Sequence, residues 1–275
     1  MLENNCNCLK VAPIGVFDSG FGGLTVMRAL KTLLPQEHIF YFGDTAHLPY
    51  GEKSADLIMN YVLESARFLE QKGVKALILA CHTASTVVGS WLAHHLSIPV
   101  IEITKPSIEE VLAKTKKQTV AILATRATLA SSFYQDAISL RRPDITLHPI
   151  PCPLFVPFVE EGLARHPAAD LIVQEYLAPL KNTSVDTLLL ACTHYPLLMH
   201  FISACLSETV QLIDPSISCA VETSRVLATQ NLLRTEPPLQ DQFFVSGDPK
   251  KFIGIAPSFL GAPIPPSCVQ RIAPV

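Results

Sequence analysis

Short apolar runs alternate with longer amphipathic stretches along almost the whole chain. Each apolar run ends in glycine or in polar residues, which is typical of buried parallel strands. The stretches between the runs carry apolar residues at helical spacing, and Pro35 and Gly73 end two of them. Strands that alternate with helices in this way predict an α/β fold built on parallel sheets.

The pattern predicts nine strands and seven main helices between them. The strands are expected at 14–17, 39–42, 77–80, 99–103, 119–124, 145–150, 188–191, 210–213 and 243–247. The helices are expected at 24–34, from Ser54 to Gly73, from 82 through Trp91, from about Pro106, and at about 129–140, 168–180 and 219–233, with Thr83, Ser85 and Thr193 as caps. Residues 1–10 are expected to form a loose tail, and the proline-containing stretch after Gly261 an edge or wrapped segment.

Two of the apolar runs end in the same dipeptide. Leu77-Ile78-Leu79-Ala80-Cys81 in the first half has a near copy in Leu188-Leu189-Leu190-Ala191-Cys192. This similarity predicts an internal duplication, with each cysteine at the carboxyl end of a strand, where parallel sheets bind ligands. We therefore expect two similar doubly wound α/β domains with the active site in the cleft between them. Residues 1–104 plus 216–275 would form the first domain and residues 105–215 the second.

Composition and charge exclude several classes of protein. The 275 residues are 49% hydrophobic, and the net charge is −3 with a pI near 6.3. That balance gives no basic surface for nucleic acid or membrane lipid. No apolar run approaches the roughly 20 residues that cross a bilayer, and the start of the chain has no secretory pattern. Eight cysteines without regular spacing indicate free thiols in a cytoplasmic protein.

The two thiols suggest acid–base chemistry. A cysteine at a helix start or beside a protonated histidine can have its pKa lowered toward neutrality. Cys81 precedes His82, Cys192 stands two residues before His194, and Asp18 ends the first strand. Thiols on opposite walls of a cleft would let one remove the α-proton of an amino acid while the other returns a proton to the opposite face.

The same residues also fit roles without acid–base chemistry at an amino acid. Free cysteine at a strand end packs as a small apolar residue in many proteins. Cys81, His82, Cys192 and His194 have the ligand number of a zinc site, and either histidine could instead serve a Cys–His hydrolase. The turn after the first strand, Asp18-Ser19-Gly20-Phe21-Gly22-Gly23, lacks the spacing of a nucleotide-binding loop, but could present backbone N–H groups to a small anion.

Taken together, the motifs resemble glutamate racemase, in the same order and over nearly the whole chain. They are Ile14-Gly15-Val16-Phe17-Asp18-Ser19-Gly20 with Gly22-Gly23, Gly43-Asp44-Thr45-Ala46 with Pro49-Tyr50-Gly51, Cys81 with Thr83-Ala84-Ser85, Phe155-Val156-Pro157 with Val159-Glu160, and Ala191-Cys192-Thr193-His194-Tyr195-Pro196. The resemblance implies interconversion of L- and D-glutamate without a cofactor or metal, supply of D-glutamate to peptidoglycan, and a homodimer.

The resemblance also implies roles for individual residues. Cys81 would act on the D-enantiomer and Cys192 on the L-enantiomer, with Asp18 and His194 assisting the proton transfers. The remaining residues implied to contact the substrate are Ser19, Pro49, Tyr50, Gly51, His82, Thr83, Thr125, Thr128, Glu160 and Thr193.

One position departs from the family pattern, because His82 stands where the family normally has a substrate-binding asparagine. An imidazole is bulkier than that amide and can carry a charge. Two alternatives to glutamate racemase therefore remain open. One is aspartate racemase or a related two-cysteine isomerase, and the other is a weakly active or non-catalytic binding protein on a racemase scaffold.

Overall fold

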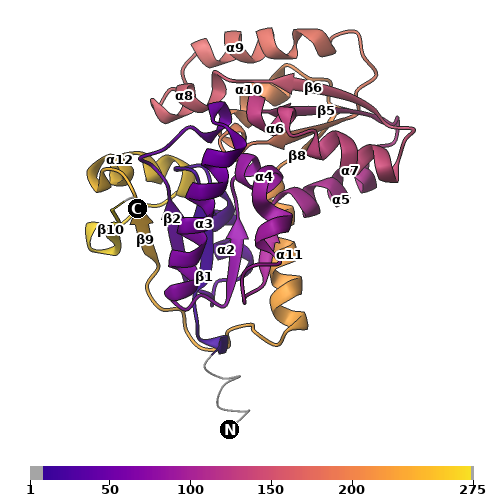
Figure 1. Cartoon of the computed structure of the whole chain (residues 1–275). Coiled ribbons are helices and arrows are strands. Elements are labelled where there is room, and N and C mark those ends of the chain that lie inside the picture. Colours follow the sequence, from indigo (N-terminus) through magenta and orange to yellow (C-terminus); the bar gives the residue numbers. More distant parts are fainter. Residues whose placement is uncertain (1–8, 274–275) are drawn as a thin grey trace.

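The computed structural model describes residues 9–273, and it contains two separate parallel sheets (Figure 1). The first sheet has the strand order β10-β9-β2-β1-β3-β4 and the second has the order β6-β5-β7-β8. The strands are β1 (Ile14–Asp18), β2 (Ile39–Gly43), β3 (Ala76–Leu79), β4 (Val100–Glu102), β5 (Thr119–Ala124), β6 (Thr146–Pro151), β7 (Thr187–Ala191), β8 (Gln211–Ile213), β9 (Gln242–Val245) and β10 (Val269–Arg271).

Helices cover both faces of each sheet, so the predicted doubly wound fold is confirmed. In β1, Val16 packs into a cluster with α2 and α12, whereas the next residue, Phe17, packs with α3 and α4 on the opposite face. The helices are α2 (Leu24–Leu33), α3 (Ala55–Gln71), α4 (His82–Leu92), α5 (Thr104–Lys114), α6 (Arg126–Ala130), α7 (Phe133–Arg141), α8 (Phe155–Glu160), α9 (Ala168–Leu177), α10 (Met199–Ala204), α11 (Pro215–Thr229) and α12 (Pro249–Leu260), with short 3₁₀ turns η1 (Tyr50–Glu52), η2 (Ala178–Leu180), η3 (Tyr195–Leu198) and η4 (Pro266–Cys268).

The two sheets repeat the same arrangement of strands. The order β2-β1-β3-β4 in the first sheet matches β6-β5-β7-β8 in the second, and every pair is parallel. The first sheet is extended by β9, which lies beside β2 in Figure 1, and by β10, which pairs with the other side of β9. Segments distant in sequence therefore share one sheet, and β10 occupies its edge as the sequence predicted for the tail.

Several local predictions were wrong. Thr83 and Ser85 lie inside α4, whose N-cap is Cys81, and the Ser85 hydroxyl donates to the Leu79 carbonyl. Thr193 precedes η3 without capping it. The helix expected at about 129–140 is two helices, because Ser132 adopts a left-handed backbone (φ 55°) between α6 and α7. Residues 1–8 of the predicted N-terminal tail lie outside the described residues.

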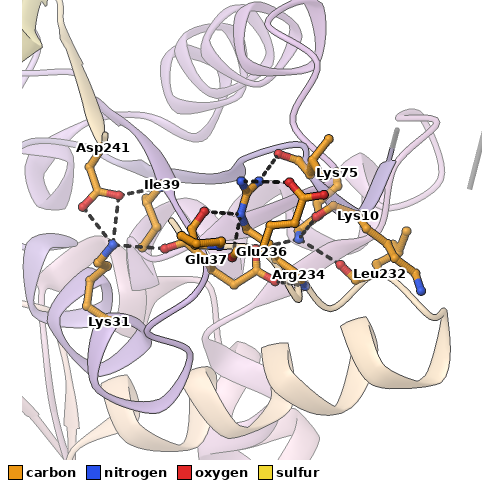
Figure 2. A network of polar contacts seen from close by, with 11 residues as sticks. Lys10, Lys31, Glu37, Ile39, Lys75, Leu232, Arg234, Glu236 and Asp241 are labelled. Atoms are coloured by element: carbon orange, nitrogen blue, oxygen red, sulfur yellow. Dashed lines mark hydrogen bonds and ion pairs between the residues drawn. The ribbon is translucent and has the colours of Figure 1, made fainter. Parts of the chain in front are cut away.

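A buried polar network lies at the amino ends of the strands of the first sheet (Figure 2). The Lys75 Nζ forms an ion pair with the Glu37 carboxylate at 2.6 Å and donates to the Leu232 carbonyl at 2.8 Å. The other oxygen of Glu37 accepts a hydrogen bond from the Arg234 backbone N–H at 2.9 Å. The network fixes the segment after α11 to the first sheet, because Lys75 and Glu37 bind backbone groups of that segment.

Candidate active site

Both repeated cysteines line one small pocket at the carboxyl ends of the strands. Cys81 follows β3 of the first sheet and Cys192 follows β7 of the second. The pocket has a volume of about 30 Å³. Its lining residues are Ser19, Leu48, Pro49, Tyr50, Gly51, Cys81, His82, Thr83, Thr125, Val156, Glu160, Cys192, Thr193 and His194. The structure thus brings together all the predicted site residues except Asp18 and Thr128, which lie behind the residues that line the pocket.

The Cys81 side of the pocket favours a protonated thiol. The thiol is buried and its Sγ lies 3.4 Å from the Ser19 hydroxyl. Burial, with a smaller contribution from the charge of Asp18, raises the pKa of Cys81 to about 12. The sequence led us to expect a lowered pKa, and that expectation is wrong for Cys81 because removal from water outweighs the helix start that follows it.

The Cys192 side carries an ion pair instead. The His194 Nδ1 lies 3.9 Å from the Cys192 Sγ, and the His194 Nε2 lies 3.0 Å from the Glu160 carboxylate. Burial alone would lower the pKa of His194, but the contacts with Cys192 and Glu160 outweigh it and raise that pKa to about 10. His194 is therefore an imidazolium at neutral pH, which places a positive charge next to the second thiol.

Asp18 links the two sides from behind the pocket. It is fully buried at the end of β1, where it accepts hydrogen bonds from the Gly20 backbone N–H at 2.9 Å and from the Thr193 hydroxyl at 3.2 Å. Burial raises the pKa of this carboxyl, partly opposed by the charge of His194. A β-carbon at Gly22 would overlap Thr193 and His194. The glycine-rich turn thus allows close packing of the two halves, a role that the sequence did not suggest.

Three threonine hydroxyls form a ring between the halves. The Thr83 hydroxyl on α4 lies 3.0 Å from those of Thr125 and Thr128, which are 2.9 Å from each other at the start of α6. Each hydroxyl can donate once and accept from its neighbour, so the ring satisfies all three. Thr128 therefore contacts the pocket through Thr83 and Thr125 without lining it.

Comparison with known proteins assigns the sequence to a family of racemases. The profile of the family described as Asp/Glu/Hydantoin racemase matches residues 14–223. A glutamate racemase of Neisseria meningitidis serogroup C is 43% identical over 257 residues, covering 93% of this chain and 95% of the relative. The chain belongs to the Asp/Glu/hydantoin racemase family. It is therefore an isomerase.

Solved structures share the fold of this racemase over almost its full length. The glutamate racemase isoform RacE1 from Bacillus anthracis superposes with a TM-score of 0.90 at 35% identity, covering 96% of this chain and 98% of that chain. The glutamate racemase from Francisella tularensis in complex with D-glutamate gives a TM-score of 0.89, with the same identity and coverage. The two-sheet architecture around the pocket is thus the architecture of those enzymes.

His82 lines the pocket of this racemase without a polar partner in the described part of the chain. Its side chain is buried, its ring lies 6.4 Å from that of Tyr134, and neither ring nitrogen has a hydrogen-bond partner among the described residues. Burial lowers the pKa of His82 to about 3. The imidazole is therefore neutral at physiological pH, and the charged form considered from the sequence is excluded.

The described residues give no support to the zinc alternative, and the pocket lining includes two residues that the motifs did not indicate. The described residues contain no group of three or more His, Cys, Asp or Glu side chains placed to hold a metal ion. Leu48 and Val156 line the pocket, and the only signal for them was their position beside predicted site residues. No helix in the described part of the chain is long and apolar enough to cross a membrane.

Proposed function

We propose that this protein is a glutamate racemase, which interconverts L- and D-glutamate without a cofactor by means of two cysteines. The observation that carries the proposal is that Cys81 and Cys192, on strands of different sheets, line the same pocket. The full-length relatives that are themselves glutamate racemases support glutamate as the substrate.

The electrostatics of the pocket support a division of labour between the thiols. With L-glutamate bound, the Cys192 thiolate, stabilised by the His194 imidazolium and its Glu160 partner, would remove the α-proton. Cys81, held protonated by burial, would return a proton to the opposite face of Cα and yield D-glutamate. The cycle leaves a thiolate at Cys81 and a thiol at Cys192, the protonation state needed for the reverse reaction.

The polar residues around the thiols are proposed to hold the substrate. Hydroxyl and backbone groups of Ser19, Gly51, Thr83, Thr125 and Thr193 would bind its amino and carboxylate groups. The other proposed contacts are Asp18, Pro49, Tyr50, His82, Thr128 and Glu160. A pocket of about 30 Å³ holds little more than one water molecule. We therefore propose that the two halves move apart to admit glutamate.

The wider setting of the enzyme follows from this activity. We propose that residues 1–104 plus 216–275 and residues 105–215 are the two domains; the membership of the two sheets supports this division. Cys81, Cys152, Cys192, Cys205, Cys219 and Cys268 are unpaired thiols, which supports a cytoplasmic location. There the enzyme would supply D-glutamate for peptidoglycan as a homodimer, an assembly that sedimentation velocity would test.

The experiment that tests the substrate uses the purified protein with glutamate and aspartate side by side. Each enantiomer is supplied alone, and the formation of its mirror image is followed by chiral chromatography. We expect both glutamate enantiomers to approach a 1:1 mixture while aspartate reacts far more slowly. Faster conversion of aspartate would assign the protein to the aspartate racemases, and no conversion of either would leave a binding protein.

A further inference from the structure

One wall of the pocket is a loop that also contacts the other half of the molecule. The loop runs from the end of β2 through η1 and supplies Pro49, Tyr50 and Gly51 to the pocket. A β-carbon on Gly51 would lie within 2.8 Å of Thr125, so the loop backbone packs directly on the start of α6. The position of this loop therefore sets the width of the pocket on that side.

Beneath the loop, outside the pocket, lies the buried carboxylate of Asp44. It accepts hydrogen bonds from the Tyr50 hydroxyl at 2.5 Å, from the Ser246 hydroxyl at 2.6 Å and from the His47 Nδ1 at 2.9 Å. Tyr50 is 1% exposed, so without Asp44 its hydroxyl would be buried with no partner. No lysine or arginine of the described residues forms an ion pair with Asp44.

Ser246 brings the C-terminal part of the chain to the same place. It follows β9 directly, and its hydroxyl both donates to Asp44 and accepts from the Ala46 backbone N–H at 2.9 Å. The next residue, Gly247, donates its backbone N–H to the Thr45 hydroxyl at 3.0 Å. A strand from the far end of the sequence thus fixes the loop at two points.

We infer that Asp44 and Ser246 are positioning residues for the substrate pocket, which act by holding Tyr50 and the η1 backbone against Thr125. Neither residue lines the pocket, and neither touches a thiol in the described structure. A buried carboxylate held only by neutral donors and a histidine costs desolvation free energy. Here it fixes the geometry of a loop that carries substrate contacts. The inference rests on the proposed racemase function, because its main readout is glutamate binding.

The test compares Ser246→Ala and Asp44→Asn with a matched control at the opposite end of the same strand. Asp241, just before β9, accepts hydrogen bonds from the Ile39 backbone N–H at 2.8 Å and from Lys31 (Figure 2). Its replacement, Asp241→Asn, removes the carboxylate from a comparable contact between β2 and β9 far from the pocket. We expect KM for glutamate to rise about tenfold in the two test variants, with kcat changed less than about threefold, and to stay unchanged in the control.

Two further measurements keep the inference distinct from the proposed function. Tyr50→Phe should raise KM as well, and combining it with Asp44→Asn should add little, because both variants remove the hydrogen bond between the Tyr50 hydroxyl and the Asp44 carboxylate. Hydrogen exchange of the 43–52 backbone should be faster in Ser246→Ala than in Asp241→Asn, whatever the substrate is. An unchanged KM together with unchanged exchange in Ser246→Ala would overturn the inference, whereas a wild-type protein that converts no glutamate would overturn only the proposed function.

Discussion

Replacing His82 by asparagine should make the free energy of unfolding fall less steeply as the pH is lowered. The imidazole is buried, neither nitrogen has a partner in the described structure, and its native pKa is about 3. In the unfolded chain the same group titrates near 6.5. Between these values the unfolded state binds more protons than the native state. The contribution of neutral His82 to stability is therefore fully present above pH 6.5 and is lost as the pH falls toward 3.

The size of the effect follows from that difference in pKa. One pKa unit corresponds to about 1.4 kcal/mol, so His82 should lower the free energy of unfolding by about 2 kcal/mol between pH 7.5 and pH 5. Asparagine has no proton to gain over this range. The difference in stability between wild type and His82→Asn should therefore shift by about 2 kcal/mol in favour of the variant as the pH falls. Other titrating groups contribute equally to both proteins and cancel.

Urea unfolding at pH 7.5 and pH 5 measures this shift, with His95→Asn as the control because His95 is exposed. Equal pH dependence in wild type and His82→Asn would refute the burial argument. The same neutrality bears on activity: His82→Asn should raise kcat/KM for glutamate by about tenfold, by relieving crowding and supplying an amide that can both donate and accept. The gain should be equal at pH 6 and pH 8, and a gain confined to pH 6 would show a charged imidazole.

The pocket and the core support three more predictions. Cys81→Ala and Cys192→Ala should each abolish racemisation in both directions, and substantial residual turnover by chiral chromatography would exclude two thiol bases. In Glu160→Gln the pKa of His194 should fall from about 10. The alkaline limb of the pH–kcat/KM profile for L-glutamate should therefore move to lower pH, and an unmoved limb would show that the ion pair plays no part in catalysis. Lys75→Met should destabilise the protein by about 3–5 kcal/mol in urea, because it leaves a buried carboxylate unpaired; a loss below about 1 kcal/mol would count against this.

The fold and much of the pocket could be predicted because local patterns carry them. Apolar runs ending in Ala-Cys place Cys81 and Cys192 at the carboxyl ends of parallel strands, and the repeat predicts matching halves. Helix boundaries were less accurate where a single backbone angle decides them, as at Ser132. A positive φ at a serine has no clear signal in the sequence.

Properties that depend on burial or on distant partners could not be predicted. The sequence allowed a charged His82, and only its enclosure in the folded protein makes it neutral. The support of Tyr50 by Asp44 and Ser246 joins residues about two hundred positions apart, so no local motif announces it. The raised pKa of Cys81 has the same origin, since desolvation depends on how the two halves close over the thiol.

The central claim is that two thiols act on opposite faces of one substrate carbon. It is tested most directly by deuterium incorporation during the first few per cent of conversion in D₂O, starting separately from L- and D-glutamate. A two-base enzyme should give product that carries deuterium at Cα in both directions, while the remaining substrate stays unlabelled. Deuterium appearing equally in substrate and product would indicate one base serving both faces, and would contradict the assignment of Cys81 and Cys192 as a pair.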